Sequence, residues 1–160
     1  MRPSIMMTQR FLRFLPYIFQ WECTYDARGN VVCENDPDDP GGETKYGIDK
    51  RSHPEVDVQA LDEARAAEIY WREYWVKYGC EWLAKPLGEV FFNACVNCGP
   101  ARARAILQAT AVPHSAAAFL GEQEAFYRRL AAARPRLKKF LNGWLDRTAQ
   151  LRKLAEHWGR

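Results

Sequence analysis

One carboxylate occupies a position where its helix would be expected to carry an apolar side chain. Over residues 9–23 the sequence has helical periodicity, and a single face at 4-3-4 spacing holds Phe11, Leu15, Ile18 and then Glu22. A negative charge on an apolar face, in the last turn of a helix, is unfavourable, so we expect this carboxyl group to favour its protonated form. Such a group can act as the general acid that cleaves a glycosidic bond.

A second carboxylate is available in the segment 35–48. Two prolines, three glycines and three aspartates among these fourteen residues predict a tightly turned loop with no regular element. Asp36, Asp38 or Asp39 could stay ionised and either stabilise an oxocarbenium-like centre or activate water. The hydroxyl of Thr44 could position that water.

The residue pattern alone leaves other interpretations open. A glutamate at the end of a helix often pairs with an arginine or reaches solvent, and a loop rich in Asp, Pro and Gly is often only a turn. Calcium binding is disfavoured, because the loop lacks the alternating acidic ladder that ends in a glutamate at its twelfth position.

The elements that must position these residues are mostly helices. Pro16 lies inside the first predicted helix and could bend it or mark its start. Residues 26–30 resemble a turn and residues 31–33 a short strand, which predicts a small β-hairpin. The other predicted helices cover residues 61–78 with Asp57 as a possible cap, 86–98, 101–111, 115–133, and a last stretch beyond Pro135. The expected fold class is mainly α with a small β element.

Composition narrows the class of protein. A chain of 160 residues, 48% apolar and 27% charged, suits one globular domain. The net charge of +3 is too small to indicate nucleic-acid binding, and no apolar run is long enough for stable insertion in a membrane. The apolar stretch at residues 1–22 is interrupted by Arg10 and Arg13 and lacks a signal-peptide cleavage site, so we expect a folded helix there.

The cysteines do not form a recognisable metal site. Five cysteines cannot all pair within one chain, and the pair Cys95 and Cys98 lacks a second pair at zinc-ribbon spacing. We expect those two to be small buried hydrophobic residues, whereas Cys23 and Cys33 could form a disulfide in an oxidising compartment. We expect no metal and no cofactor.

Aromatic and basic side chains are abundant but less specific. Tryptophans at helical spacing are usually core residues, although they could stack on sugar rings: Trp71, Trp75, Trp82 and Trp144. Basic residues in the second half predict a solvated face, or a surface that meets anionic wall polymer or lipid: Arg102, Arg104, Arg128, Arg129, Arg134, Arg136, Lys138 and Lys139.

The order of several short motifs resembles glycoside hydrolase family 108, a family of N-acetylmuramidases that includes phage-type endolysins and secretion-associated muramidases. The usual front of the family reads approximately E-G-G-Y, N-D-P and D-x-G-G-x-T-x-x-G-I, and residues 21–25 and 35–48 are similar to it. Residues 91–100, running on to 106–108, resemble its peptidoglycan-binding-type region, and residues 140–147 resemble its closing helix.

The resemblance implies a lysozyme-like fold and a peptidoglycan hydrolase that cleaves the β-1,4 bond between N-acetylmuramic acid and N-acetylglucosamine. It implies a single domain over residues 1–160, with a catalytic front at about 9–85 and a helical region at about 86–155. The glycan strands of peptidoglycan would be its partner, with no cofactor, and we expect a monomer. Implied catalytic residues are Glu22, Asp39 and Thr44, and residues implied to shape the saccharide groove are Tyr25, Tyr46 and Asn97.

Two departures from the family pattern leave questions open. Cys23-Thr24 replaces the usual glycine pair, and about eight extra residues, roughly 26–33, precede the loop. The extra residues leave Asp38 as an alternative to Asp39. Both departures also keep an alternative function open, namely a non-catalytic peptidoglycan-binding or secretion-accessory protein. We expect synthesis in the cytoplasm without a signal peptide, and action in the periplasm or cell wall after holin- or secretion-dependent release.

Overall fold

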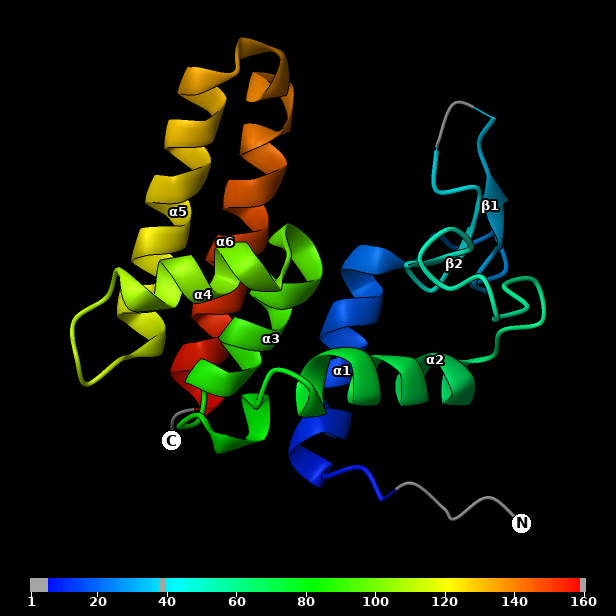
Figure 1. The fold of residues 1–160 in the computed structure, drawn as a ribbon, viewed down its shortest axis with the longest axis horizontal. Coiled ribbons are helices and arrows are strands. Elements are labelled where there is room, and N and C mark those ends of the chain that lie inside the picture. The colour runs from blue at the N-terminus through cyan, green and yellow to red at the C-terminus, as the bar shows by residue number, and fades with distance from the viewer. Residues whose placement is uncertain (1–5, 38–39, 159–160) are drawn as a thin grey trace. The chain divides into compact units, whose positions relative to one another are not determined.

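The computed structural model describes residues 6–37 and 40–158, which form two compact units that meet in sequence at Glu73 and Tyr74. Helices dominate both units, and a small antiparallel sheet lies in the first (Figure 1). The predicted mainly-α fold class is therefore confirmed, while a single domain over residues 1–160 stays a prediction. Among the described residues, no helix is both long enough and apolar enough to cross a membrane.

The first unit begins with α1 (Gln9–Glu22), as the sequence predicts. The Thr8 side chain caps it by accepting a hydrogen bond from the Phe11 N–H at 3.3 Å. Pro16 lies inside the helix on its exposed side, so it does not mark the start. The predicted apolar face is buried, with Phe11 and Ile18 fully enclosed.

The sheet corrects the sequence prediction for this region. Its strands are β1 (Glu34–Asn35), β2 (Glu43–Lys45) and β3 (Ile48–Asp49), paired antiparallel in the order β1-β2-β3. The strand predicted at 31–33 is wrong, since only Val31 pairs there, in an isolated bridge with Tyr25. The prediction that segment 35–48 holds no regular element is also wrong, because β2 gains its hydrogen bonds from a strand on each side.

The second helix is shorter than predicted. α2 (Glu63–Tyr70) starts at Asp62, whose Oδ1 accepts a hydrogen bond from the Arg65 N–H at 2.8 Å. Asp57 is not its cap and instead accepts from the Ala60 N–H at 3.2 Å, one turn earlier in the chain. A π-helical segment, η1 (Trp71–Val76), replaces the rest of the helix predicted over 61–78.

The second unit is built on α3 (Leu87–Cys98), in which every residue from Leu87 to Cys95 is buried. Around it pack the short 3-10 segment η2 (Cys80–Trp82), α4 (Pro100–Gln108), α5 (Ala116–Ala133) and α6 (Leu141–Trp158). The helices predicted at 86–98, 101–111 and 115–133 are confirmed within a few residues. α5 and α6 lie side by side, joined by the 3-10 segment η3 (Pro135–Phe140), where the sequence predicts α-helix (Figure 1).

Candidate active site

A polar cavity of about 500 Å³ in the first unit brings together two of the predicted catalytic residues. Glu22 reaches it from the end of α1, and Thr44 reaches it from β2. The other residues that line it come from the sheet and the turns around it: Gly41, Gly47, Asp49, Arg51 and Ser52. A half-buried carboxyl group and a hydroxyl group thus face the same solvent-accessible space.

Glu22 is held by a close approach of the turn between β2 and β3. Gly47 has φ +73°, and a methyl group added there would lie 2.8 Å from Glu22 Cβ and 2.6 Å from the Tyr70 hydroxyl. Glycine is therefore required both by the left-handed backbone and by the lack of space. The Tyr70 hydroxyl donates a hydrogen bond to the Tyr46 carbonyl at 2.8 Å, which fastens the turn to α2.

Tyr46 is strained in that turn. It has φ +56°, a left-handed conformation that costs a side-chain-bearing residue about 1–2 kcal/mol. Its ring packs on Phe19 of α1 at a centroid distance of 5.3 Å, and its carbonyl accepts the Tyr70 hydrogen bond. The saccharide-contacting role predicted for Tyr46 stays a prediction, and the structure adds a positioning role for its backbone.

Sequence reasoning missed Asp49, the second described carboxylate that lines the cavity. Asp49 is the cross-strand partner of Thr44, and its Oδ1 accepts a hydrogen bond from the Ser52 N–H at 2.8 Å. Burial raises the pKa of Asp49, but hydrogen bonds from Ser52 outweigh that effect, so its pKa lies below the ordinary value of 3.8. The only sequence signal was an aspartate three residues before a serine, a common turn pattern.

The remaining cavity contacts shape its polar wall. The Thr44 hydroxyl donates to the Gly42 carbonyl at 3.4 Å, which leaves its oxygen lone pairs able to accept from water. The Arg51 N–H donates to the Gly41 carbonyl at 3.2 Å, so the glycine-rich turn is held against the segment after β3. Asp39 and its alternative Asp38 lie outside the described residues, and their roles stay predictions.

Tyr25 lies in the hairpin that follows α1. It is 47% exposed and bridges to Val31. Its side chain hydrogen-bonds with the thiol of Cys23, and burial is the main reason that the pKa of Cys23 rises to about 11. Burial also raises the pKa of Tyr25. The predicted contact of Tyr25 with a saccharide stays a prediction.

Asn97 belongs to the second unit, where a buried polar network occupies its side chain. Its Oδ1 accepts from Arg147 at 3.3 Å, and its Nδ2 donates to the Tyr127 hydroxyl. Arg147 also donates to Asn93 Oδ1 at 3.0 Å, and Gln123 donates to the Tyr127 hydroxyl at 3.2 Å. These bonds tie α3 to α5 and α6, so the structure shows a packing role for Asn97. Its predicted role at the saccharide groove stays a prediction.

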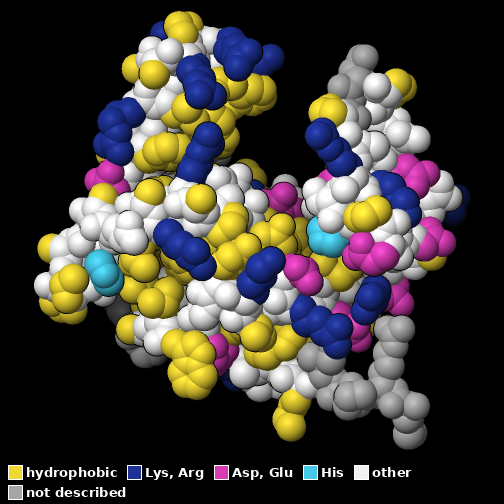
Figure 2. Space-filling model, viewed as in Figure 1, with side chains coloured by type: hydrophobic (Ala, Val, Ile, Leu, Met, Phe, Trp, Pro, Cys, Tyr) yellow, Lys and Arg dark blue, Asp and Glu magenta, His cyan; other side chains and the backbone are white. Residues whose placement is uncertain are grey.

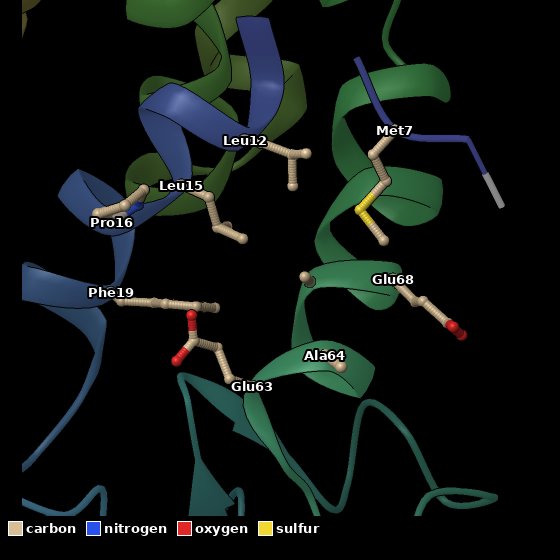
Figure 3. A pocket seen from close by; sticks show the side chains of 9 residues that line it. Met7, Leu12, Leu15, Pro16, Phe19, Glu63, Ala64 and Glu68 are labelled. Atoms are coloured by element: carbon tan, nitrogen blue, oxygen red, sulfur yellow. The ribbon is translucent and has the colours of Figure 1, made fainter. Parts of the chain in front are cut away.

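A second cavity in the first unit, of about 460 Å³, has a different character (Figure 3). It lies between α1 and α2, and the aliphatic and aromatic side chains of Met7, Leu15 and Phe19 face it. Glu63 and Glu68 also line this cavity, but its other described lining residues are apolar and none of them carries a hydroxyl group that could orient a water. The polar cavity is therefore the better candidate site.

The cysteines are free thiols, Cys23 and Cys33 included. Cys95 is fully buried, as predicted, whereas Cys98 is only partly buried. Within residues 6–37 and 40–158, no group of three or more His, Cys, Asp or Glu side chains is placed to hold a metal ion.

Comparisons with known proteins identify the family of the chain. The glycosyl hydrolase 108 family matches residues 15–99, just over half of the 160 residues. The structure of Brucella abortus SagA is similar to this chain, with a TM-score of 0.71 and 25% sequence identity over 94% of this chain and 95% of that one. The comparison with curated proteins gave no match. The family match includes Glu22, Thr44 and Asp49 of the polar cavity, and the chain therefore belongs to the glycosyl hydrolase 108 family.

Proposed function

We propose that this protein is an N-acetylmuramidase that hydrolyses the β-1,4 bond between N-acetylmuramic acid and N-acetylglucosamine in peptidoglycan. The observation that carries the proposal is the polar cavity, in which a half-buried glutamate at a helix end shares the space with a hydroxyl group and a fixed aspartate. Membership of a glycosyl hydrolase family supports the same class of reaction.

In the proposed mechanism Glu22 donates its proton to the glycosidic oxygen as the bond to the anomeric carbon breaks. The ring then carries positive charge near that carbon, and an ionised carboxylate stabilises it or takes a proton from the attacking water. Thr44 accepts a hydrogen bond from that water and orients it. The water oxygen bonds to the anomeric carbon, so the products are two sugar chains, one with a new reducing end.

Two aspartates are candidates for the ionised partner. Asp39 is implied by the family pattern, and Asp49 lines the same cavity as Glu22. Asp49 suits the part chemically, because the Ser52 hydrogen bonds keep its pKa low and hold its carboxylate in place. Changing Asp38, Asp39 and Asp49 to asparagine one at a time separates the candidates by which change removes activity.

The test measures release of reducing ends from purified peptidoglycan. We expect Glu22→Gln to lower the rate by ~100- to 10,000-fold, the usual contribution of a general acid. Glu55→Gln, a change at an exposed glutamate of the same unit, is the matched control and should keep the wild-type rate. Equal rates for wild type and Glu22→Gln would refute the proposal.

Product analysis decides which bond is cut. Muramic acid at every new reducing end, read by mass spectrometry after borohydride reduction, supports a muramidase, whereas N-acetylglucosamine there contradicts it. Retention of the wild-type chain on insoluble peptidoglycan with no release of reducing ends would instead support the non-catalytic binding protein.

A further inference from the structure

The end of the α5–α6 hairpin carries an unusual concentration of positive charge. We call residues 128–141 the hairpin tip. Every basic side chain in it is exposed, and no Asp or Glu occurs between Glu124 and Asp146. Its six basic residues are Arg128, Arg129, Arg134, Arg136, Lys138 and Lys139. Since the whole chain has a net charge of +3, the remaining residues together carry −3.

Little of this charge is neutralised within the described structure. Arg129 forms an ion pair with Glu122 at 2.7 Å, and the arginine side chain is still 63% exposed. Another ion pair of this hairpin joins Arg152 and Glu124, which lie outside the tip. Figure 2 shows Lys and Arg side chains gathered around the end of the hairpin, with hydrophobic side chains between them. The tip therefore projects a positive field toward solvent.

Apolar surface lies among these charges. A cavity of about 340 Å³ is lined by two basic residues, Arg128 and Lys138, and by four residues with aliphatic side chains, namely Ala131, Ala132, Pro135 and Leu141. Phe140, which precedes Leu141 in the chain, is 47% exposed, with Lys139 Nζ 5.0 Å from its ring centre. Cationic heads around an aliphatic cavity and an exposed aromatic ring are typical of proteins that bind at the surface of a membrane.

We infer that the hairpin tip binds the surface of a bilayer that contains anionic phospholipid. The arginine and lysine heads contact lipid phosphates, while Phe140 and the aliphatic cavity take acyl-chain methylenes at the headgroup boundary. The lipid is favoured over a soluble polyanion, such as duplex nucleic acid or a wall polymer, because the outer surface of those polymers is mainly phosphate and sugar and offers no acyl chain to fill the aliphatic cavity. This inference is independent of the proposed hydrolase activity and would stand if that activity failed.

The test is co-sedimentation of the full chain with vesicles. We expect binding to vesicles of phosphatidylcholine and phosphatidylglycerol at 7:3, no binding to phosphatidylcholine alone, and loss of binding at high salt. The triple variant Arg136→Gln, Lys138→Gln, Lys139→Gln should bind ~100-fold more weakly, because each basic residue near an anionic surface contributes on the order of 5-fold.

A second triple variant controls for net charge. Lys85→Gln, Arg102→Gln, Lys153→Gln removes the same number of charges from exposed sites of the same unit and should keep wild-type binding within a few-fold. If both triple variants lose binding equally, the tip has no special role and the inference fails. Binding of wild type to phosphatidylcholine alone, equal to that on anionic vesicles, also overturns it.

A single change at the apolar residue distinguishes lipid from polyanion. Phe140→Ser keeps all six charges and should weaken vesicle binding by ~10-fold while leaving binding to double-stranded DNA unchanged. Unchanged vesicle binding by Phe140→Ser would identify the tip as a polyanion site and overturn the lipid inference. Thermal unfolding of each variant tests whether the fold is intact. We expect little change in the unfolding temperature, because all substituted side chains are exposed.

Discussion

The contact between Gly47 and Glu22 gives the sharpest test of how this site is built. Changing Gly47 to alanine would place a methyl group 2.8 Å from Glu22 Cβ, whereas ordinary contacts begin at 3.4 Å. Relief of that clash alone requires a displacement of 0.6 Å, the difference between these two distances. The Tyr70 hydroxyl would lie 2.6 Å from the same methyl group, so the turn cannot relieve the first clash by moving toward α2.

Two costs can be separated for Gly47→Ala. The left-handed φ of +73° costs an alanine about 1–2 kcal/mol. Overpacking against Glu22 and Tyr70 adds about 1–3 kcal/mol. Gly29→Ala is the matched control, because Gly29 has φ +82° and nothing within 4 Å of its added methyl group. We expect Gly29→Ala to lower the free energy of unfolding by the first cost only, and Gly47→Ala to lower it by both.

Activity should separate the same two variants. Displacement of a general acid by a fraction of an ångström to 1 Å can lower the rate by ~10- to 100-fold, so the release of reducing ends should fall for Gly47→Ala and persist for Gly29→Ala. Urea unfolding and the reducing-end assay measure both quantities on the same samples. Equal stability and equal activity for the two variants would refute the claim that this turn positions Glu22.

Three further outcomes follow from the structure. The pKa of Asp49 in the folded protein is depressed, so its ionised form stabilises the fold above the ordinary value of 3.8, and this effect is lost as the pH falls below that value. The difference in the free energy of unfolding between wild type and Asp49→Asn should therefore be constant above about pH 5 and shrink in acid. A difference that does not change with pH contradicts this prediction. With a pKa of about 11 instead of 9.0, Cys23 at pH 8 should have about 100-fold less thiolate than in the urea-unfolded chain, and the greater nucleophilicity of that thiolate offsets part of the loss. Its reaction with iodoacetamide should therefore be roughly 10-fold slower, and peptide-resolved alkylation measures both rates. Trp82 is 90% exposed, whereas Trp75 is fully buried. In urea unfolding, replacement by alanine should lower the free energy of unfolding by less than about 0.5 kcal/mol at Trp82 and by about 3–5 kcal/mol at Trp75. Similar losses at the two positions would show that Trp82 is packed.

The helices were predictable because their signals are local. Periodic apolar residues and a capping side chain lie within a few residues of each other, as at Thr8 for α1 and Ser115 for α5. From the sequence, Asp57 is a possible cap of α2, whereas the structure uses Asp62, the residue directly before the helix. The π-helical segment after Tyr70 had no sequence signal, since its residues also suit an α-helix.

The sheet and half of the cavity were not predictable in the same way. Strands of two or three residues are too short to show alternation, and β2 exists because β1 and β3 pair with it. That pairing brings Asp49 beside Thr44, so the carboxylate most easily overlooked in the sequence lines the same cavity as Glu22. Glu22 itself was found because a charge interrupts an apolar helix face, which is a local signal.

The two departures from the family pattern, which favoured a non-catalytic protein, are accommodated locally in the structure. Cys23 has φ −99°, an extended conformation open to any residue, so no glycine is needed after Glu22. The extra residues form a closed turn, in which the Asp26 N–H donates to the Asn30 carbonyl at 2.9 Å and the Val32 N–H donates to the Thr24 carbonyl at 3.0 Å. The chain then enters β1, where Glu34 pairs with Thr44, so the inserted hairpin is compatible with the strand pairing that places Thr44. Neither departure gives a physical reason for the cavity to be inactive.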